Sequence, residues 1–437
     1  MQNEFRERRE SLRSMLDEES IAIIPNSFEK VRNRDVSYQF RSDSDFYYLT
    51  GFEEPESLAV FIPHRPQGEY ILFCRENDSH AETWHGRRVG LTGACSVYGA
   101  DHSFPYEDLD EILPGLMENK KRIYYPMGRY REFDKKIMNW VTHVGSMGRA
   151  GIHAPDQFLS LGQIIHEMRL IKTPNEVKSI EKAIEISIAG HLAAMKKVKP
   201  RIKEYQLEAE IIKEFMKGGS RYPAYPSIVG SGRNACILHY TENKDFIEDG
   251  DLVLIDAGAE LNFYAADITR TFPANGKFSE SQKIIYEIVL NAQLAAIDEV
   301  KAGNSWNDPH LAAVRVITSG LKDIGILKGP VDELIEREAY MPYFMHKTGH
   351  WLGIDVHDVG DYKINGEWRN FQPGMITTVE PGIYISGHDK TVEDRWKNIG
   401  VRIEDDVLVT ERGNRVLSAT LPKTVQGIES TIGVDGS

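Results

Sequence analysis

The most informative stretch of this chain reads Asp251-Leu-Val-Leu-Ile-Asp256-Ala-Gly-Ala-Glu-Leu-Asn-Phe-Tyr-Ala-Ala-Asp267-Ile-Thr-Arg-Thr271. Its two β-rich runs predict two strands joined by a short loop. If the loop centres on Leu261-Asn262, Asp256 and Asp267 lie directly opposite each other, with Cβ atoms about 5 Å apart. Facing carboxylates repel and are costly to desolvate, so a shared proton, an arginine or a cation has to compensate them. The competing interpretation is a solvated surface hairpin with incidental acids.

A second informative segment, His346-Lys-Thr-Gly-His350-Trp-Leu-Gly-Ile-Asp-Val-His357-Asp358, places three of the chain's 14 histidines within twelve residues. Gly349 and Gly353 flank His350 and permit close backbone approach. Neutral imidazole is a common metal ligand and proton carrier. One histidine alone is more often structural, but three beside glycines indicate a site.

Two further acids stand near the ends of β-rich runs. Glu380 lies in Thr378-Val-Glu380-Pro381-Gly382, where Pro381 removes a backbone donor. In Gly400-Val-Arg402-Ile-Glu404-Asp405, strand alternation sends Arg402 and Glu404 to one face. Each acid taken alone is best interpreted as a surface residue.

Together these segments supply four carboxylates and one imidazole, from Asp256, Asp267, His350, Glu380 and Glu404. Such a set suits Mn²⁺, Co²⁺, Mg²⁺ or Zn²⁺, and its four negative charges match two divalent ions. Two metals about 3.5–4 Å apart can hold a bridging water, lower its pKa and stabilise a tetrahedral intermediate. Neither a nucleophile elbow nor a P-loop competes in this sequence.

The ordered set Asp, Asp, His, Glu, Glu resembles the metallopeptidases of the pita-bread fold, which include methionine aminopeptidase, prolidase and aminopeptidase P. The resemblance is strongest to the bacterial aminopeptidase P group. It rests on the blocks Ile-Val-Gly-Ser-Gly at 228–232, Leu-His239-Tyr-Thr-Glu-Asn, Leu-Ile-Asp256-Ala-Gly, Asp267-Ile-Thr-Arg-Thr-Phe, Gly-His350-Trp-Leu-Gly, Val-Glu380-Pro-Gly and Arg402-Ile-Glu404-Asp. It extends to Ser44-Asp-Phe-Tyr-Tyr-Leu-Thr-Gly51-Phe, Trp84-His-Gly-Arg-Arg and His166-Glu-Met-Arg, and so covers most of the chain.

This resemblance implies two divalent ions, usually manganese with cobalt or zinc as possibilities, that are bridged by Asp267 and Glu404. Asp256 is a further ligand, and His350 and Glu380 complete one site each. It makes Glu380 the general base for a metal-bridging water. Further active-site positions fall on His239 and His357, which orient substrate and steady the oxyanion, and on His346, Arg402 and Tyr384. The implied reaction cleaves the bond between an N-terminal residue and a following proline.

The domain boundary is expected near residue 170. Thr173 has the features of a helix N-cap, with Pro174 in the first turn and Glu176 completing a capping box. Residues 171–437 then mix long helices with strand runs, which predicts an α+β domain. Residues 1–170 begin with an amphipathic helix over Asn3–Leu16. Strands are expected at Ile21–Ile24, Leu58–Ile62, Tyr70–Cys74 and Arg122–Tyr125, which predicts an N-terminal α/β domain that restricts substrate access and makes oligomer contacts.

Composition narrows the class of protein further. The 437 residues carry a net charge of −14, which argues against a general binder of nucleic-acid phosphates. Three scattered cysteines favour a reducing compartment, and no run is long enough to span a bilayer. The charged start, Met1 to Glu10, does not read as a secretory signal, so a cytoplasmic protein is expected.

Several alternatives stay open at this level. A prolidase acting on Xaa-Pro dipeptides uses the same metal set, a non-catalytic pita-bread module would bind peptides, and a creatinase-like enzyme would not need these carboxylates. Resemblance suggests a homodimer or homotetramer, in which Trp84 or Asp35 reaches a neighbouring site. Lys347 adds a positive charge that is unusual at its position, and Tyr222, Tyr225 and Trp351 are candidates for a proline-binding notch. The polar tail from Gln426 to Ser437 is expected to be ordered only in part.

Overall fold

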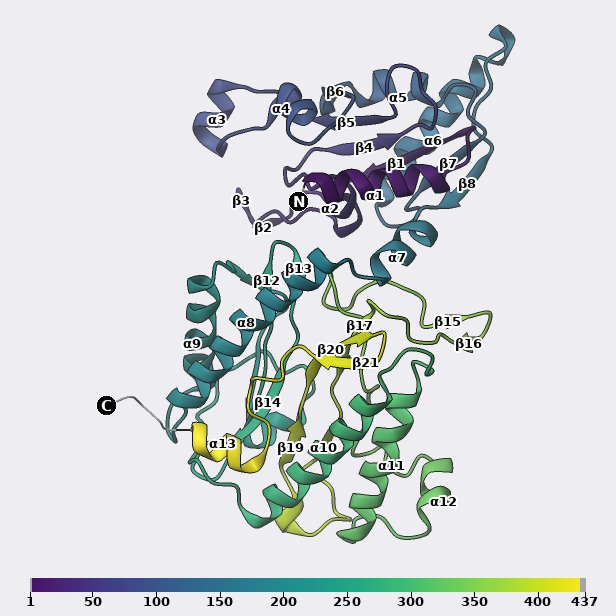
Figure 1. Ribbon diagram of the computed structural model, residues 1–437. Helices are drawn as coiled ribbons and strands as arrows, with labels where there is room; N and C mark the ends of the chain where they lie inside the picture. The colour runs from purple at the N-terminus through teal and green to yellow at the C-terminus, as the bar shows by residue number, and fades with distance from the viewer. Residues whose placement is uncertain (1, 433–437) are drawn as a thin grey trace. The chain divides into compact units, whose positions relative to one another are not determined.

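The computed structural model describes residues 2–432, and the chain divides into two units, Met1–Met168 and Arg169–Ser437. Figure 1 draws both units, with most of their helices and strands labelled. The boundary expected from the sequence lies two residues from this division. The part of the polar tail from 433 to 437 lies outside the described residues, and its preceding part forms helix α13 (Val425–Thr431).

The first unit is built on a six-stranded sheet with the order β6-β5-β4-β1-β7-β8. Strand β1 pairs antiparallel with β4 and parallel with β7, so the sheet is mixed. The four strands expected from the sequence are all present, and the two edge strands, β6 and β8, were not predicted. The strands are β1 (Ser20–Pro25), β4 (Leu58–Phe61), β5 (Tyr70–Cys74), β6 (His102–Pro105), β7 (Arg122–Tyr125) and β8 (Gln157–Ser160).

Helices and a small hairpin complete this α/β unit. Side chains of the sheet and of α5 and α6 form one buried cluster, with Ile23, Val60, Phe73 and Phe133 among its members. The helices are α1 (Gln2–Met15), α2 (Ser44–Thr50), α3 (Ser79–His85), α4 (Gly90–Ser96), α5 (Leu109–Met117), α6 (Arg131–Ser146) and α7 (Gly162–Leu170), which crosses the division between the units. Strands β2 (Val31–Asn33) and β3 (Val36–Ser37) form an exposed hairpin.

The second unit opens with the helix that the capping box predicted. The Thr173 side chain accepts a hydrogen bond from the Glu176 backbone N–H, and the Glu176 carboxylate accepts one from the Thr173 N–H, at 3.3 and 2.9 Å. Ser279 caps a second helix in the same way. The helices are α8 (Pro174–Lys197), α9 (Glu204–Lys217), α10 (Glu280–Glu299), α11 (Asp308–Asp323), α12 (Val331–Glu336) and α13.

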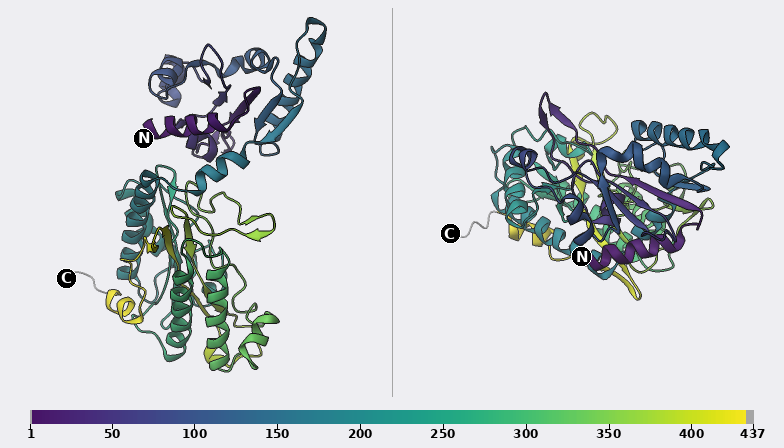
Figure 2. Two further views of the ribbon diagram at one scale, coloured as in Figure 1. Left: turned by 45° about the vertical axis from the view of Figure 1, so that its right-hand side comes forward. Right: turned by 90° about the horizontal axis from the view of Figure 1, so that it is seen from above.

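Two helix pairs flank the strands of the second unit, as Figures 1 and 2 show. Helices α8 and α9 pack on each other and on β9, β10, β12 and β13, while α10 packs on α11, β17, β18 and β19. This arrangement of helix pairs around small sheets is the α+β architecture that the sequence predicted for residues 171–437. Its strands are β9 (Tyr222–Pro223), β10 (Ile228–Ser231), β11 (Leu252–Asp256), β12 (Ala259–Leu261), β13 (Tyr264–Ala265), β14 (Thr269–Pro273), β15 (Lys363–Ile364), β16 (Glu367–Trp368), β17 (Ile376–Val379), β18 (Gly382–Ile385), β19 (Ile399–Arg402), β20 (Asp405–Thr410) and β21 (Gly413–Val416).

The predicted register of the 251–271 hairpin was wrong by two residues. Asp256 pairs with Thr269 and not with Asp267, because the turn centres on Asn262 and Phe263. The two acids therefore remain on one face as diagonal neighbours. Within residues 2–432, no helix is both long and apolar enough to cross a membrane.

Candidate metal centre

Asp256 and Asp267 converge at the end of β11 and the start of β14. Asp256 is the last residue of β11 and Asp267 comes two residues before β14, and both side chains are buried. The Tyr225 hydroxyl lies 2.6 Å from Asp256 Oδ1 and 2.5 Å from Asp267 Oδ1. One phenol therefore ties together the two carboxylates that the sequence analysis singled out.

His350 and Glu380 approach the same point from a loop and from the end of β17. His350 Nε2 lies 3.3 Å from Asp267 Oδ2 and 3.6 Å from Glu380 Oε1. The opposite ring nitrogen, Nδ1, lies 3.0 Å from the Trp351 carbonyl, which accepts its hydrogen. This leaves Nε2 facing the carboxylates. Burial alone would lower the pKa of His350, but the hydrogen bond to Asp267 and the charge of Glu380 raise it to about 9, so a metal ion at Nε2 would take the place of a proton.

Glu404 completes the group from the short link between β19 and β20. Its carboxylate is 1% exposed and accepts a hydrogen bond from the Thr269 hydroxyl at 2.7 Å. Ligand atoms of Asp267, His350 and Glu404 all lie within 4.8 Å of one another. Arg402 and Glu404 both reach Thr269, which agrees with the prediction that they share a face.

The buried carboxylates of the site repel one another electrostatically. Burial together with the neighbouring carboxylates raises the pKa of Glu380 to about 7, against the opposing charge of His350. Burial and nearby acids also raise the pKa of Asp267 and, further, that of Glu404. Arg402 donates to Asp256 at 2.6 Å. Within the described part of the chain, Asp267, Glu380 and Glu404 have no lysine or arginine partner.

A chain of polar contacts connects Arg402, Tyr384 and His346. Arg402 Nη1 donates to the Tyr384 hydroxyl at 3.0 Å, and His346 Nε2 lies 2.9 Å from the same oxygen. The Lys347 carbonyl lies 2.7 Å from His346 Nδ1 and accepts its hydrogen. Burial and the Arg402 charge lower the pKa of His346 to about 3, so this imidazole is neutral and accepts from the tyrosine.

His239 and His357 occupy the more open side of the site. Both side chains are exposed, and the His357 ring packs edge-on against His350 with 4.2 Å between centroids. Burial and the charges of His350 and His239 lower the pKa of His357. All ten sequence-predicted positions lie close together. Nine of them line a cavity of about 610 Å³, and Tyr384 contacts it through His346 and Arg402.

Both units of the chain are similar to proteins of known family. Residues 178–411 match metallopeptidase family M24, and residues 5–124 match the aminopeptidase P N-terminal domain. The chain belongs to metallopeptidase family M24. It is 44% identical to the Xaa-Pro aminopeptidase of Haemophilus influenzae, over 98% of this chain and 96% of that protein. Its identity to the Xaa-Pro aminopeptidase of Escherichia coli is 43%, over 98% and 97%.

Similarity to solved structures supports the assignment of the chain to family M24. Aminopeptidase PepP of Pseudomonas aeruginosa superimposes with a TM-score of 0.98 at 53% identity, over 99% of this chain and 98% of that one. Zinc-substituted E. coli aminopeptidase P in complex with product gives a TM-score of 0.96 at 42% identity, over 99% and 98%. The likeness covers both units of the chain, so it is not confined to the catalytic fold.

The side chains at this site of the M24 chain form a set of donor atoms that suits divalent metal ions. Carboxylate oxygens and one imidazole form the donor set, and within the described residues Asp267, Glu380 and Glu404 form no ion pair with a lysine or arginine. Hard or borderline cations prefer these donors, and a cation would relieve the repulsion that raises the carboxyl pKa values. Asp256 differs from the other acids because Arg402 already neutralises one of its oxygens.

Sequence reasoning missed several residues that support the ligands. The sequence suggests Tyr225 only as a candidate for the proline-binding notch, whereas in the structure its hydroxyl bridges two acids. Asp406 accepts a hydrogen bond from the Asp267 backbone, and Thr269 links Glu404 to Arg402. Of the other two notch candidates, Trp351 is fully buried and neither lines the cavity. Side-chain hydroxyls that bridge ligands carry no sequence pattern of their own.

Proposed function

We propose that this chain is a metal-dependent Xaa-Pro aminopeptidase, which hydrolyses the bond between an N-terminal residue and a penultimate proline. The observation that carries this is the convergence of four carboxylates and an imidazole on one face of the pita-bread fold. Identity of 44% to a named Xaa-Pro aminopeptidase over almost the whole chain supports the substrate class. A prolidase is not favoured, because the likeness includes the aminopeptidase P N-terminal domain.

Two divalent ions, most simply Mn²⁺ with Co²⁺ or Zn²⁺ as alternatives, would be held by Asp256, Asp267, His350, Glu380 and Glu404. Asp267 and Glu404 are the proposed bridging ligands, as the family resemblance implies, and ligand atoms of these two carboxylates lie within 4.8 Å of each other. When bound, such ions polarise the scissile carbonyl and activate a water molecule. Four carboxylate charges match two divalent ions, which is the basis for proposing two.

Glu380 is the proposed general base. Its carboxylate lines the cavity and is oriented by the Thr378 hydroxyl, 3.4 Å away, and by a backbone hydrogen bond to Thr348. It would take a proton from the attacking water and deliver it to the proline nitrogen as the C–N bond breaks. The amide carbon keeps the hydroxyl oxygen, so the products are a free carboxylate and a secondary amine.

The two exposed histidines would stabilise the developing oxyanion. His239 and His357 line the cavity and are free to donate a hydrogen bond to a carbonyl oxygen. Preorganised donors of this kind typically contribute a factor of about 10²–10³ each. Arg402, Tyr384 and His346 would orient the substrate, and their mutual hydrogen bonds hold all three in place.

Selection for proline follows from the chemistry of the bond. An Xaa-Pro amide has no N–H, so a peptidase that needs a donor there cannot use it. The cavity has apolar walls from Pro226, Ile228, Leu238 and Val356, which are suited to a pyrrolidine ring. These residues replace Tyr222 and Trp351 as candidates for the proline-binding surface.

We also propose that the chain works as a homodimer or homotetramer in the cytoplasm. Trp84 and Val31 of the first unit are 74% and 63% exposed, so both are available for contact with a second copy of the chain. On this proposal the first unit, taken as residues 1–170, narrows the entrance to the catalytic domain, residues 171–437, of a neighbouring chain, and Trp84 or Asp35 reaches that neighbouring site. The three cysteines are free thiols, which suits a reducing compartment.

A length series tests the substrate class. Hydrolysis of an Xaa-Pro dipeptide is compared with that of an Xaa-Pro-Yaa tripeptide and of a matched tripeptide with alanine second. We expect turnover of the proline tripeptide only when divalent metal is present, and loss of turnover with a chelator. Activity confined to the dipeptide would establish a prolidase, and a chain that binds no divalent ion would be a peptide-binding module.

A further inference from the structure

The two exposed histidines of the site, His239 and His357, differ from the other site residues in how their imidazoles are held in position. Within residues 2–432, neither the His239 nor the His357 imidazole makes a hydrogen bond to another protein group. Their positions are therefore set by their backbone and by packing, of which the His350 ring is one part for His357. The residue that follows His357 in the chain, Asp358, is in contrast 6% exposed and heavily bonded.

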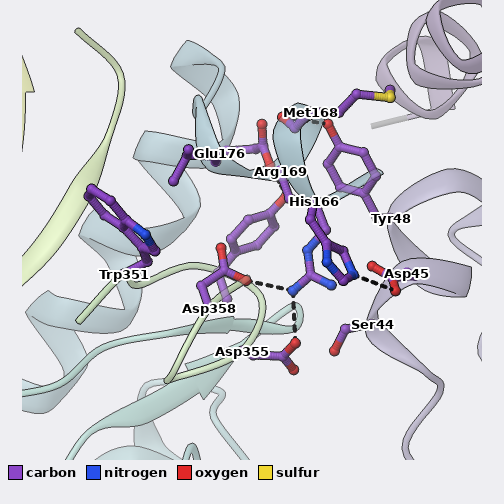
Figure 3. A network of polar contacts seen from close by, with 12 residues as sticks. Ser44, Asp45, Tyr48, His166, Met168, Arg169, Glu176, Trp351, Asp355 and Asp358 are labelled. Carbon is purple, nitrogen blue, oxygen red and sulfur yellow. Dashed lines mark hydrogen bonds and ion pairs between the residues drawn. The ribbon is translucent and has the colours of Figure 1, made fainter. Parts of the chain in front are cut away.

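Asp358 is the centre of a buried ion network in the second unit, and Figure 3 shows the contacts of Arg169 with Asp358 and Asp355. Arg169 Nη2 donates to its Oδ1 at 2.5 Å, and Lys172 Nζ donates to its Oδ2 at 2.8 Å. The side chains of Arg169, Lys172 and Asp358 are each 1% exposed. Arg169 also donates to Asp355 at 2.8 Å, so two cations balance two carboxylates.

The loop between His350 and His357 is wound tightly around this network. The Asp358 N–H donates to the Trp351 carbonyl at 2.8 Å, and the Gly353 N–H donates to the Asp355 carbonyl at 3.1 Å. A Cβ atom on Gly353 would lie 2.1 Å from Asp358 Oδ2. Glycine is therefore required there for the carboxylate to fit, which gives a reason for the second glycine of the histidine segment.

The Asp358 carboxylate is charged in the folded chain. Burial alone would raise its pKa, but the charges of Lys172 and Arg169 bring it below the ordinary value. A buried ion pair of this kind is weak evidence for stability, because hydrophobic replacements are often as stable. What it does supply is one fixed geometry, since a charged carboxylate held on both oxygens cannot rotate.

We infer that Asp358, clamped by Arg169 and Lys172, is a positioning residue that fixes the backbone of His357 and thereby aims its imidazole into the cavity. The inference rests on the proposed function, in which His357 stabilises the oxyanion. Because Asp358 is adjacent to His357, a shift of the clamp moves the imidazole directly. A displacement of about 1 Å of a catalytic group can cost about 10²-fold in rate.

The first test is Asp358→Asn in the full-length, metal-loaded chain, with an Xaa-Pro-Yaa tripeptide as substrate. We expect kcat to fall about 10²-fold, with KM changed less than about threefold and metal content unchanged. Asp355→Asn is the matched control, since it removes the other carboxylate on the same Arg169 nitrogen but leaves both bonds to Asp358. It should keep kcat within about twofold. An equal loss in both variants would overturn the inference.

A double-mutant cycle with His357→Ala separates positioning from general damage. If Asp358 acts through His357, the Asp358→Asn, His357→Ala double variant should be no slower than His357→Ala alone. If the fold-losses in kcat of the two single variants multiply in the double variant, Asp358 acts independently of His357, and the inference is overturned. Loss of bound metal in Asp358→Asn would do the same, because the clamp would then support the ligands.

Lys172 provides a second approach should Asp358→Asn not fold. Lys172→Met removes one half of the clamp, whereas Lys172→Arg keeps the charge and should restore most of kcat. Equal kcat in these two variants would contradict the inference. Failure of the proposed function is distinguishable, because the unmodified chain would then show no turnover of the tripeptide at all.

Discussion

Glu404 is the single side chain whose removal should be most damaging. It is 1% exposed, and one of its carboxylate oxygens lies within 4.8 Å of ligand atoms of Asp267 and His350. Glu404→Ala deletes a proposed bridge between the two ions, so we expect metal loss and turnover below about 10⁻³ of the original. Elemental analysis after dialysis and kcat on an Xaa-Pro-Yaa tripeptide measure both effects.

The control for Glu404→Ala is Glu411→Ala, which removes an exposed acid just beyond β20. Metal content and kcat should stay unchanged in that variant. A Glu404→Ala protein that retained two ions per chain would contradict the bridging assignment.

His239 should behave in the opposite way. It lines the cavity without touching the metal donor group, so His239→Ala should keep both ions. We expect kcat to fall about 10²–10³-fold, or about 2.7–4 kcal/mol, as for loss of one oxyanion donor. Metal analysis alongside kinetics decides the assignment, and a metal-free His239→Ala variant would refute it.

For single residues, the sequence predicted the positions of the candidate ligands but not the side chains that form hydrogen bonds with them. The five metal candidates lie next to recognisable features: a strand end, a glycine pair or a proline turn. The Tyr225 hydroxyl, by comparison, reaches acids 31 and 42 positions away. That contact depends on how β9, β11 and β14 are brought together, and no local pattern encodes it.

Among the secondary-structure elements, the hairpin of β11 to β14 shows where local reasoning fails. Asn262 and Phe263 have φ values of 50° and 70°, so both occupy the left-handed region. Two-residue hairpin turns need this conformation, and Asn-Gly is the usual signal for it. Phenylalanine at the second position gives no such signal, which is why the predicted register slipped by two residues while the face of the acids was right.

Helix α8 differs from this hairpin, because a local sequence pattern, the capping box, predicted where the helix begins. Thr173→Ala removes the side-chain acceptor of the capping box. We expect the free energy of unfolding to fall by about 1 kcal/mol, with kcat unchanged. Denaturant titration of the two proteins measures this, and Thr173→Ser, which keeps the acceptor, is the control. Equal stability of the alanine and threonine proteins would show that the cap contributes nothing.

Considered as a whole molecule, the site is assembled from parts that are distant in the chain. Its cavity is lined by residues from 225 to 404, which come from loops and strand ends of several small sheets. Periodicity can predict each strand, but it cannot say which strand ends meet. The meeting point could be predicted only through resemblance to a family with the same order of acids and histidine.

The stability of the whole fold should depend on His191. This residue of α8 is fully buried, and its Nε2 lies 3.0 Å from the Ala257 carbonyl. Burial is the main cause that lowers its pKa, from 6.5 to about 4. The folded chain therefore keeps His191 neutral at a pH where the unfolded chain already binds a proton. Its contribution to stability is complete above about pH 6.5 and is lost as the pH falls towards 4.

His191→Gln tests this, because glutamine can keep a donor to Ala257 but cannot titrate. Between pH 7 and pH 5 we expect the original chain to lose about 1–2 kcal/mol more free energy of unfolding than the variant. Urea titrations of both proteins at the two pH values give the four free energies of unfolding that the comparison needs. Parallel losses in both proteins would show that His191 is already protonated in the folded chain or stays neutral in the unfolded one. The acid sensitivity of the fold would then have to arise from other buried groups, of which His310, with a pKa lowered by burial to about 4, is the next to replace.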